Sequence, residues 1–419
     1  MWFALAFFIG VLVLLNVSGY FGIKTLLAKG ANPGFRKFAP RVYWLIDVIF
    51  ILFSLVFAFF IRSADNPEHV QYRQFFIISG GFTLILVVKT GFLLFVALHY
   101  LKNLLSLVGV KIFENSSTPS LYMQRVRKTN FLLKAGVVFS SFLFLAVLHG
   151  IFFGRYNFHV EKVDVFIEGL PPAFEGLRVV HFSDTHLGSF KSIEPVAKGI
   201  KMMADLKPDL IVFSGDMVNN VADEAERFIP VFQKLDPPLG MFSVLGNHDM
   251  GDYRRWGTIP ETDSNIERLI EIKQEMGFDV LLNEHRFIKI GNDSVMIAGV
   301  KNWGQPPFAK YGNLEKAIGT NAGFPVKLLI SHDPSHWRGE ILPLTNIQLT
   351  FSGHTHGFQF GIITPFFKWS PVQWKYSEWI GLYQEGNQLL YVNGGFGFLG
   401  FPGRVGVPPE ITLLTLKKK

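Results

Sequence analysis

The chain has 419 residues, enough for two domains of ordinary size, and it contains no cysteine, which excludes disulfides and thiolate metal ligands. Hydrophobic residues make up 49% of it and charged residues only 17%, which favours membrane segments. The formal charge of +7 is uneven, because residues 1–160 carry 15 Lys and Arg against 4 Asp and Glu, leaving 25 against 29 for the rest. The folded second part therefore has no basic excess, and we expect no nucleic-acid partner.

Residues 1–155 are predicted to form a transmembrane region. Four apolar stretches there approach the ~20 residues that cross a bilayer core. A cleaved signal peptide is the alternative for the first stretch, but its basic residues, Lys24 and Lys29, follow the apolar run instead of preceding it. The four predicted spans are residues 2–23, 42–61, 75–100 and 131–153.

The loops between these stretches predict the orientation of the chain. The first and third loops are rich in Lys and Arg, whereas the second is balanced in charge. Because basic loops stay in the cytoplasm, both termini should lie outside. This predicts a multi-pass plasma (inner) membrane protein with its second domain on the exoplasmic side. Within the spans, Asp47 and Lys89 form either a buried ion pair or, alternatively, Lys89 snorkels towards the headgroups.

After a predicted linker at 156–176, residues 177–419 have the pattern of an α/β domain. Apolar runs that lead to polar motifs are typical of strands buried on both faces, and helical segments are predicted at 195–206, 222–235 and 265–276. This alternation favours two sheets packed face to face between helical layers. The five apolar runs are residues 178–183, 210–214, 241–245, 327–331 and 348–352. Shorter strands are predicted at 287–290, 295–298, 389–392 and 411–416.

The polar motifs after the five runs hold candidate metal ligands. Ligand groups gather past the carboxyl ends of such strands, so we expect them to meet at one edge. The Asp-x-His and His-x-His pairs should each point to one side, because side chains of extended segments repeat every second residue. Two Asp, one Asn and four His exceed the needs of one tetrahedral zinc and suit two ions of Mn, Fe or Zn, with Mn favoured. The candidates are Asp184, His186, Asp216, Asn247, His332, His354 and His356.

These ordered motifs resemble those of the calcineurin-like metallophosphoesterases, over about residues 177–417. The sequence is most similar to the membrane-associated bacterial branch that includes UDP-diacylglucosamine pyrophosphatase-like and cell-wall-associated phosphoesterases. The resemblance implies a four-layer α/β/β/α sandwich. It departs from the usual pattern of the branch at Asp333, after the histidine of the fourth motif, and at Phe358, after the last one.

The resemblance also implies a role for each motif residue. One metal would be held by Asp184, His186 and His356, and the other by Asn247, His332 and His354. Asp216 would bridge the two metals. His248 would act as general acid to the leaving oxygen or stabilise the transition state, and Asp249 would orient it.

The predicted function is a membrane-anchored dimetal phosphohydrolase that cleaves a phosphodiester or pyrophosphate bond by metal-activated water. Two adjacent divalent ions suit this reaction because phosphoryl transfer needs mainly positioning and charge stabilisation. The predicted substrate is a phosphoester, lipid-linked or part of the cell envelope. A non-catalytic membrane sensor or transporter component with a metal-bound domain is the alternative, but such a module would not need His248. The sequence does not predict the oligomeric state.

Residues 358–379 are unusually aromatic and contain interleaved lysines. One interpretation is a surface that faces membrane lipids and admits a lipid-linked substrate. The other is a lid packed on its own domain. Among the remaining histidines, we expect His181 to be packed behind the first motif and His285 and His336 to be surface residues.

Overall fold

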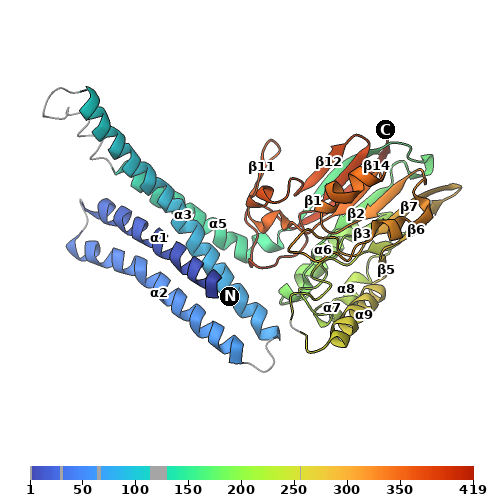
Figure 1. Ribbon diagram of the computed structural model, residues 1–419, viewed down its shortest axis with the longest axis horizontal. Helices are drawn as coiled ribbons and strands as arrows, with labels where there is room; N and C mark the ends of the chain where they lie inside the picture. The colour runs from blue at the N-terminus through green and yellow to red at the C-terminus, as the bar shows by residue number, and fades with distance from the viewer. Residues whose placement is uncertain (1, 29–31, 64–67, 114–129, 255) are drawn as a thin grey trace. The chain divides into compact units, whose positions relative to one another are not determined.

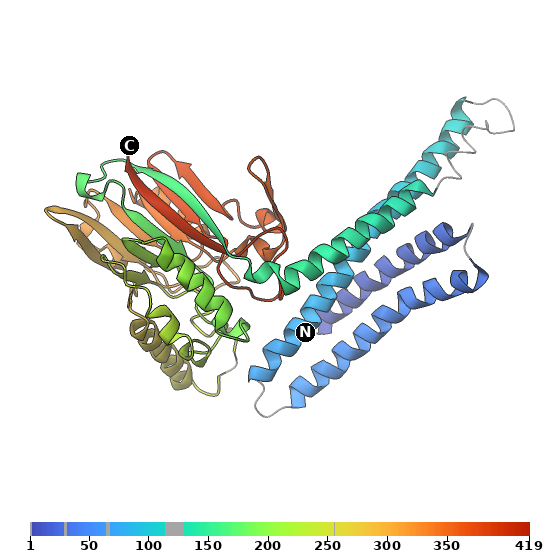
Figure 2. The same cartoon turned by 180° about the vertical axis from the view of Figure 1, so that it is seen from behind.

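The computed structural model describes residues 2–28, 32–63, 68–113, 130–254 and 256–419. The chain divides into two compact units, Met1–His149 and Gly150–Lys419. Each unit is described by itself. Figures 1 and 2 show the helices of the N-terminal unit and the sheets of the C-terminal unit.

The N-terminal unit is helical; three of the four predicted spans lie within a helix, and the fourth, 131–153, extends one residue beyond its helix. Among the described residues, the stretches Phe75–Val108 and Phe131–Tyr156 are long and apolar enough to cross a membrane. The third helix has 46 residues, or about 69 Å at 1.5 Å per residue, so it is far longer than the expected span. The helices are α1 (Trp2–Leu27), α2 (Pro33–Ser63), α3 (Glu68–Phe113) and α5 (Phe131–Phe152).

A buried ion pair connects three of these helices. The Lys89 ammonium on α3 is paired with the carboxylate of Asp47 on α2 and lies 2.6 Å from Asn16 Oδ1 on α1. It also lies 3.9 Å from the centre of the Tyr43 ring. The structure therefore shows Lys89 in a buried ion pair, not snorkelling towards the headgroups. Burying a charge is costly unless it is paired, and here Asp47 and Asn16 compensate the buried ammonium of Lys89.

The C-terminal unit contains two six-stranded sheets. The first has the order β1-β14-β2-β3-β4-β5 and the second β12-β13-β9-β8-β7-β6. In the first sheet the strands are β1 (His159–Ile167), β14 (Glu410–Lys418), β2 (Arg178–Phe182), β3 (Leu210–Phe213), β4 (Met241–Ser243) and β5 (Phe278–Val280). In the second they are β12 (Gly381–Glu385), β13 (Gln388–Val392), β9 (Leu349–Ser352), β8 (Lys327–Ile330), β7 (Asp293–Gly299) and β6 (Glu284–Ile290).

The two sheets pack face to face and are covered by helices on their outer faces. Alternate residues of the strands, such as Val212 of β3 and Phe351 of β9, are fully buried in one core between the sheets. On the outer face of the second sheet, Leu329 and Leu390 pack against Trp337. Helix α6 lies over the outer face of the first sheet (Figure 2). The structure is therefore the expected four-layer α/β/β/α sandwich.

The helical elements of this unit are short compared with those of the N-terminal unit. The α-helices are α6 (Glu194–Asp205), α7 (Asp223–Glu226), α8 (Ile229–Phe232), α9 (Ile259–Glu275), α10 (Leu314–Ile318) and α11 (Leu342–Leu344). A π-helical turn spans Trp337–Ile341. The 3-10 turns are Gly154–Tyr156, Pro172–Phe174, Leu187–Ser189, Gly319–Asn321, His356–Gln359 and Pro371–Trp374.

Two predicted elements differ in the structure. The expected linker at 156–176 contains strand β1, which pairs with β14 at the edge of the first sheet. Of its side chains only Val165 and Ile167 are buried, so it lacks the continuous apolar run that marks the central strands. The helix expected at 222–235 is two short helices, and Pro230 lies in the first turn of the second one, where its fixed φ and missing N–H are tolerated.

Candidate metal centre

The seven predicted ligands lie in loops at one edge of the two sheets. Strands β2, β3 and β4 are parallel neighbours in the first sheet, and β8 and β9 are parallel neighbours in the second. Their carboxyl ends therefore face the same way within each sheet. Six of the seven ligand residues are buried and the seventh, His354, is nearly so. The structure thus brings together every predicted ligand.

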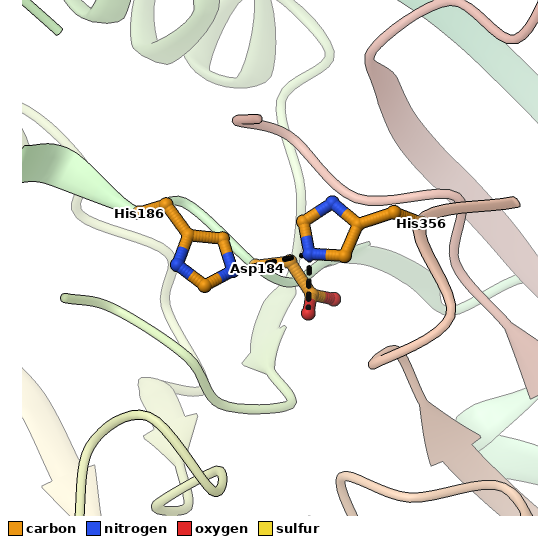
Figure 3. Close-up of side chains that lie close together, drawn as sticks. All are labelled: Asp184, His186 and His356. Carbon is orange, nitrogen blue, oxygen red and sulfur yellow. Dashed lines mark hydrogen bonds and ion pairs between the residues drawn. The ribbon is translucent and has the colours of Figure 1, made fainter. Parts of the chain in front are cut away.

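One cluster consists of Asp184, His186 and His356. The two histidine Nε2 atoms are 3.1 Å apart, and His356 Nε2 is 3.2 Å from Asp184 Oδ1. Figure 3 shows the His356 ring nitrogen facing both partners. The three residues offer ligand atoms that lie within 4.8 Å of one another, so they could hold one metal ion.

The second cluster consists of Asp216, Asn247, His332 and His354. Asn247 Oδ1 lies 2.8 Å from His354 Nδ1 and 3.1 Å from His332 Nε2. His332 Nε2 is also 3.1 Å from Asp216 Oδ2. The Asn247 amide donates to the hydroxyl of Tyr253 at 2.8 Å, which fixes the amide with its oxygen towards the histidines.

The geometry fits two cations that share Asp216. Its Oδ2 lies 3.1 Å from His332 in one cluster and 3.8 Å from His186 in the other. Imidazole nitrogens that face each other at 3.1–3.3 Å have the spacing of ligands around a common ion, since bonds of about 2.1 Å place neighbouring ligand atoms about 3 Å apart. The all-N/O donor set suits divalent transition ions.

The electrostatics of the clusters also suit cations. Burial lowers the pKa of His354 to about 4 and that of His186 well below its usual value, so these imidazoles are neutral, the form that binds metals. Burial alone would raise the pKa of Asp216, but nearby histidines, His332 above all, hold it well below its usual range. The carboxylates Asp216 and Asp184 in turn outweigh burial and raise the pKa of His332 to about 10. The site therefore strongly favours positive charge between its carboxylates.

The backbone brings the paired ligands together differently from our expectation. Asp184 and His186 have φ of 54° and 43°, and His354 and His356 have φ of 70° and 51°. These are left-handed conformations, not an extended segment with alternating side chains. The backbone of Asp216 is also in the left-handed region, with φ of 59°. Such conformations are rare outside glycine and cluster at functional sites, which is consistent with a site held by the surrounding fold.

Glycines allow the motif loops to approach one another closely. A Cβ at Gly246, before Asn247, would clash with the carboxylate of Asp216. A Cβ at Gly353, before His354, would clash with Ser183 and the carboxylate of Asp184. The glycines in these two motifs are therefore required by the contact between loops from different strands.

His248 lies beside the clusters and is only partly buried. Its ring is 5.0 Å from the His186 ring and 4.5 Å from the Tyr253 ring. Its Nδ1 is 2.8 Å from the carbonyl oxygen of Asn219. A carbonyl only accepts hydrogen bonds, so this contact places a proton on Nδ1 and leaves Nε2 as the ring nitrogen that can exchange a proton.

Asp249 has a different place from the one expected. Its carboxylate accepts hydrogen bonds from the backbone N–H groups of Met217, at 2.7 Å, and of Asp216, at 3.1 Å. It also accepts one from Gly246 and is paired with the Lys273 ammonium at 2.8 Å. The polar partner of the His248 ring is instead a carbonyl, and Asp249 fixes the loops that carry Asp216 and Asn247.

Lys273 was not predicted as part of the site. It lies on α9, and it and Asp249 are both fully buried. Lys273 Nζ also donates to the carbonyl oxygen of Val244 at 2.9 Å. The sequence carries one signal for it, because Lys273 occupies the apolar face of an amphipathic helix beside Leu269 and Ile272.

Replacing Lys273 with methionine should destabilise the protein by about 3–5 kcal/mol, because the Asp249 carboxylate would stay buried without its counter-charge. The free energy of unfolding of the full-length protein in detergent measures this effect. Lys201→Met removes an exposed pair with Asp205 and is the control, with an expected change close to zero. Equal stability of the two variants would show that the buried pair is not needed.

Two tyrosines contact the predicted ligands, and neither contact was predicted from the sequence. The Tyr376 hydroxyl lies 2.9 Å from His354 Nε2, the nitrogen that faces away from Asn247. Such partners fix the ring orientation of a metal-binding histidine. Tyr253 holds the Asn247 amide, as described above. Tyr376 belongs to the aromatic segment 358–379, and the unusual composition of that segment was the sequence signal for it. Nothing in the sequence indicates that Tyr253 lies at the site.

The other histidines follow the predictions only in part. His181 is packed behind the site as expected, 3.0 Å from Ser214 Oγ, and burial lowers its pKa to about 3. His336 is fully buried, not a surface residue, and stacks on Trp303 with ring centres 4.6 Å apart. His285 is half-buried and bonded to the carbonyl of Ala317. In both cases polar partners compensate the burial, which the local sequence does not reveal.

Known families match both parts of the chain. Residues 177–358 match the family of calcineurin-like phosphoesterases. Residues 1–155 match a family described as a probable calcineurin-like phosphoesterase transmembrane domain. The chain is therefore a membrane protein with a metallophosphoesterase domain.

Relatives in bacteria agree with these matches. An uncharacterized metallophosphoesterase of Bacillus subtilis, YkuE, is 32% identical over 59% of this chain and 82% of its own length. An uncharacterized metallophosphoesterase of Campylobacter jejuni is 24% identical over 98% of this chain and 97% of its own length. The UDP-2,3-diacylglucosamine pyrophosphatase LpxG of Chlamydia muridarum is 27% identical over 58% of this chain and 86% of its own length. The chain belongs to the calcineurin-like phosphoesterase family and is a metal-dependent phosphoesterase.

Proposed function

We propose that this protein is a membrane-anchored dimetal phosphohydrolase that cleaves a phosphodiester or pyrophosphate bond in a lipid-linked or cell-envelope substrate. The observation that carries the proposal is the pair of ligand clusters joined by Asp216, with His248 beside them. The substrate class is suggested by the chlamydial relatives, whose name refers to a diacylated sugar nucleotide. A binding module would have no use for a partly exposed histidine at this position.

In the proposed mechanism, Asp184, His186 and His356 would hold one divalent ion, Asn247, His332 and His354 would hold the other, and Asp216 would be shared. When bound, the ions neutralise charge on the phosphoryl oxygens and lower the pKa of an attacking water. We propose manganese as the native metal.

The protein's own groups position the substrate and move the proton. The Asn219 carbonyl keeps the Nδ1 proton of His248 in place. When the ring is protonated on both nitrogens, Nε2 is therefore the atom that gives its proton to the leaving oxygen, and the ring is left neutral with its proton on Nδ1. Tyr253 and His186 flank the His248 ring and limit its rotation. Asp249 and Lys273 hold the loops that carry Asp216 and Asn247.

The proposed location is the plasma (inner) membrane, crossed four times, with the phosphoesterase domain on the exoplasmic side. The support is the excess of Lys and Arg in the first and third loops of residues 1–155. The substrate would then be encountered at the outer surface of that membrane.

A hydrolysis screen tests the proposed function. Purified full-length protein with Mn²⁺ should hydrolyse bis-p-nitrophenyl phosphate, and this activity should disappear with EDTA and return with added metal. A panel of lipid extracts, diacylated sugar nucleotides and soluble monoesters then identifies the substrate class, with acylated substrates expected to give the highest kcat/KM. Lack of turnover of every substrate with Mn²⁺, Fe²⁺ and Zn²⁺ would contradict the proposal.

A further inference from the structure

The aromatic segment 358–379 divides into an inner and an outer part. The inner part belongs to a small core that includes Trp379, Ile380 and Val407, with Tyr376 packed against it. The outer part leaves five large apolar side chains in solvent. Their exposed fractions are Phe366 99%, Trp374 77%, Phe358 60%, Phe367 55% and Ile362 51%. The interpretation as a packed lid therefore holds for the inner part only, and for the outer part the lipid-facing surface stays a prediction.

The exposure of the outer part is built into a small hairpin. Strand β10 (Ile362–Ile363) pairs antiparallel with β11 (Lys368–Trp369). The turn between them is closed by hydrogen bonds from Thr364 N to Phe367 O and from Phe367 N to Thr364 Oγ1, both 2.9 Å. Phe366 is therefore held at the tip of an ordered turn. Single exposed apolar residues are common, but a group of aromatic residues presented in this way marks an interaction surface.

The base of the hairpin is connected by backbone hydrogen bonds to the first residue of the C-terminal unit. Gly361 N donates to Val405 O at 2.9 Å, and the neighbouring Arg404 N donates to Gly150 O at 3.1 Å. Gly150 lies near the end of α5, within the apolar stretch Phe131–Tyr156 that is long enough to cross a membrane. Phe366 is only five residues from Gly361, a reach of at most roughly 17 Å. The tip is therefore only a short stretch of chain from the end of that apolar stretch.

The charges of the hairpin region suit a bilayer with anionic lipids. Lys368 and Lys375 are exposed beside the aromatic side chains. The single acidic residue of segment 358–379, Glu378, is buried and paired with Arg338 at 2.6 Å. Aromatic rings with neighbouring lysines are typical of the membrane interface, where the rings enter and the ammonium groups meet headgroup phosphates.

We propose that the hairpin tip, with Phe366 and Phe367, inserts into the interface of the bilayer that anchors the chain. The same segment reaches the metal centre, since the Tyr376 hydroxyl is 2.9 Å from His354 Nε2. Docking therefore places the centre beside the lipid surface, where a lipid-linked phosphoester arrives. This consequence for the substrate rests on the proposed function, whereas the docking itself does not.

The absence of cysteine makes the docking directly measurable. Phe366→Cys, labelled with the fluorophore NBD in the full-length protein, is reconstituted in vesicles of phosphatidylethanolamine and phosphatidylglycerol. We expect a blue-shifted emission that lipids with a doxyl spin label quench and that aqueous iodide does not. The control is Lys201→Cys on α6, where iodide should quench and doxyl lipid should not; the Lys201 side chain is 74% exposed. Iodide quenching at position 366 equal to the control would overturn the proposal, as would shielding from both quenchers, which indicates a protein partner.

An activity measurement tests the consequence separately. Phe366→Ser combined with Phe367→Ser should lower turnover of a phosphoester embedded in vesicles by about tenfold and leave turnover of bis-p-nitrophenyl phosphate unchanged. Phe287→Ser, on strand β6, removes an exposed aromatic ring elsewhere and is the control. Equal effects on both substrates would contradict the role in substrate access. Absence of any hydrolysis would contradict the proposed function but not the docking measured by quenching.

Discussion

Asp216→Asn is expected to reduce the kcat/KM for bis-p-nitrophenyl phosphate by on the order of 10³-fold or more, while the protein stays folded. Asp216 Oδ2 lies 3.1 Å from His332 Nε2 and 3.8 Å from His186 Nε2, so one oxygen atom contacts a histidine of each cluster. Asparagine keeps the size of the side chain and an oxygen for the backbone N–H of His248, but it removes the charge. Charge stabilisation by bound ions is worth several kcal/mol, and each 1.4 kcal/mol is about tenfold in rate.

The matched control for this variant is Asp205→Asn. Asp205 is an exposed carboxylate on α6, paired only with Lys201 among the contacts described. Its replacement should leave kcat/KM unchanged. Circular dichroism and the thermal unfolding midpoint confirm that both variants are folded. Activity of Asp216→Asn within a factor of about two of the wild type would contradict the shared position of Asp216 between two ions.

His248→Gln should lower the rate by an amount that depends on the leaving group. A general acid contributes about 10²–10⁴-fold when the leaving oxygen is basic. An alkyl phosphodiester should therefore lose activity over this range, whereas p-nitrophenolate needs little protonation and its ester should lose much less. The substitution removes the acidic Nε2 group, which is the proton donor because Nδ1 is bonded to the Asn219 carbonyl. The measurement is kcat for both esters at saturating Mn²⁺.

His285→Gln is the control for this experiment. His285 is half-buried at strand β6, bonded to the carbonyl of Ala317, and takes no part in either cluster. Both esters should be hydrolysed at the wild-type rate by this variant. An equal loss for both esters in His248→Gln would contradict proton transfer and assign His248 to stabilisation of the transition state.

Much of the site was predictable because each ligand follows a strand with a strong sequence signal. The runs before Asp184, Asp216 and His332 are mostly apolar, so their burial on both faces follows from the pattern, and the alternation of strands with helices predicts their parallel pairing. Parallel strands place the residues after their carboxyl ends at one edge. The four-layer fold follows from that reasoning and is confirmed, and the structure brings the seven predicted ligands together.

The rest depends on contacts between distant segments, which no local pattern records. The left-handed backbone at Asp184 and His186 is imposed by loops packed against each other, and their sequence alone favours an extended segment. The buried partner of Asp249 comes from Lys273, 24 residues away on a helix. Strand β1 at His159–Ile167 is stabilised by its pairing with β14 near the other end of the domain, so its own half-exposed sequence was interpreted as a linker.

The central claim is that the two clusters hold two metal ions joined by Asp216. Inductively coupled plasma mass spectrometry of the purified, active full-length protein, after removal of loosely bound ions, measures this directly. We expect about two transition-metal ions per chain in the wild type and about one or fewer in Asp216→Asn. Fully active wild-type protein with less than about one ion per chain, or an equal metal content in the two proteins, would contradict the account.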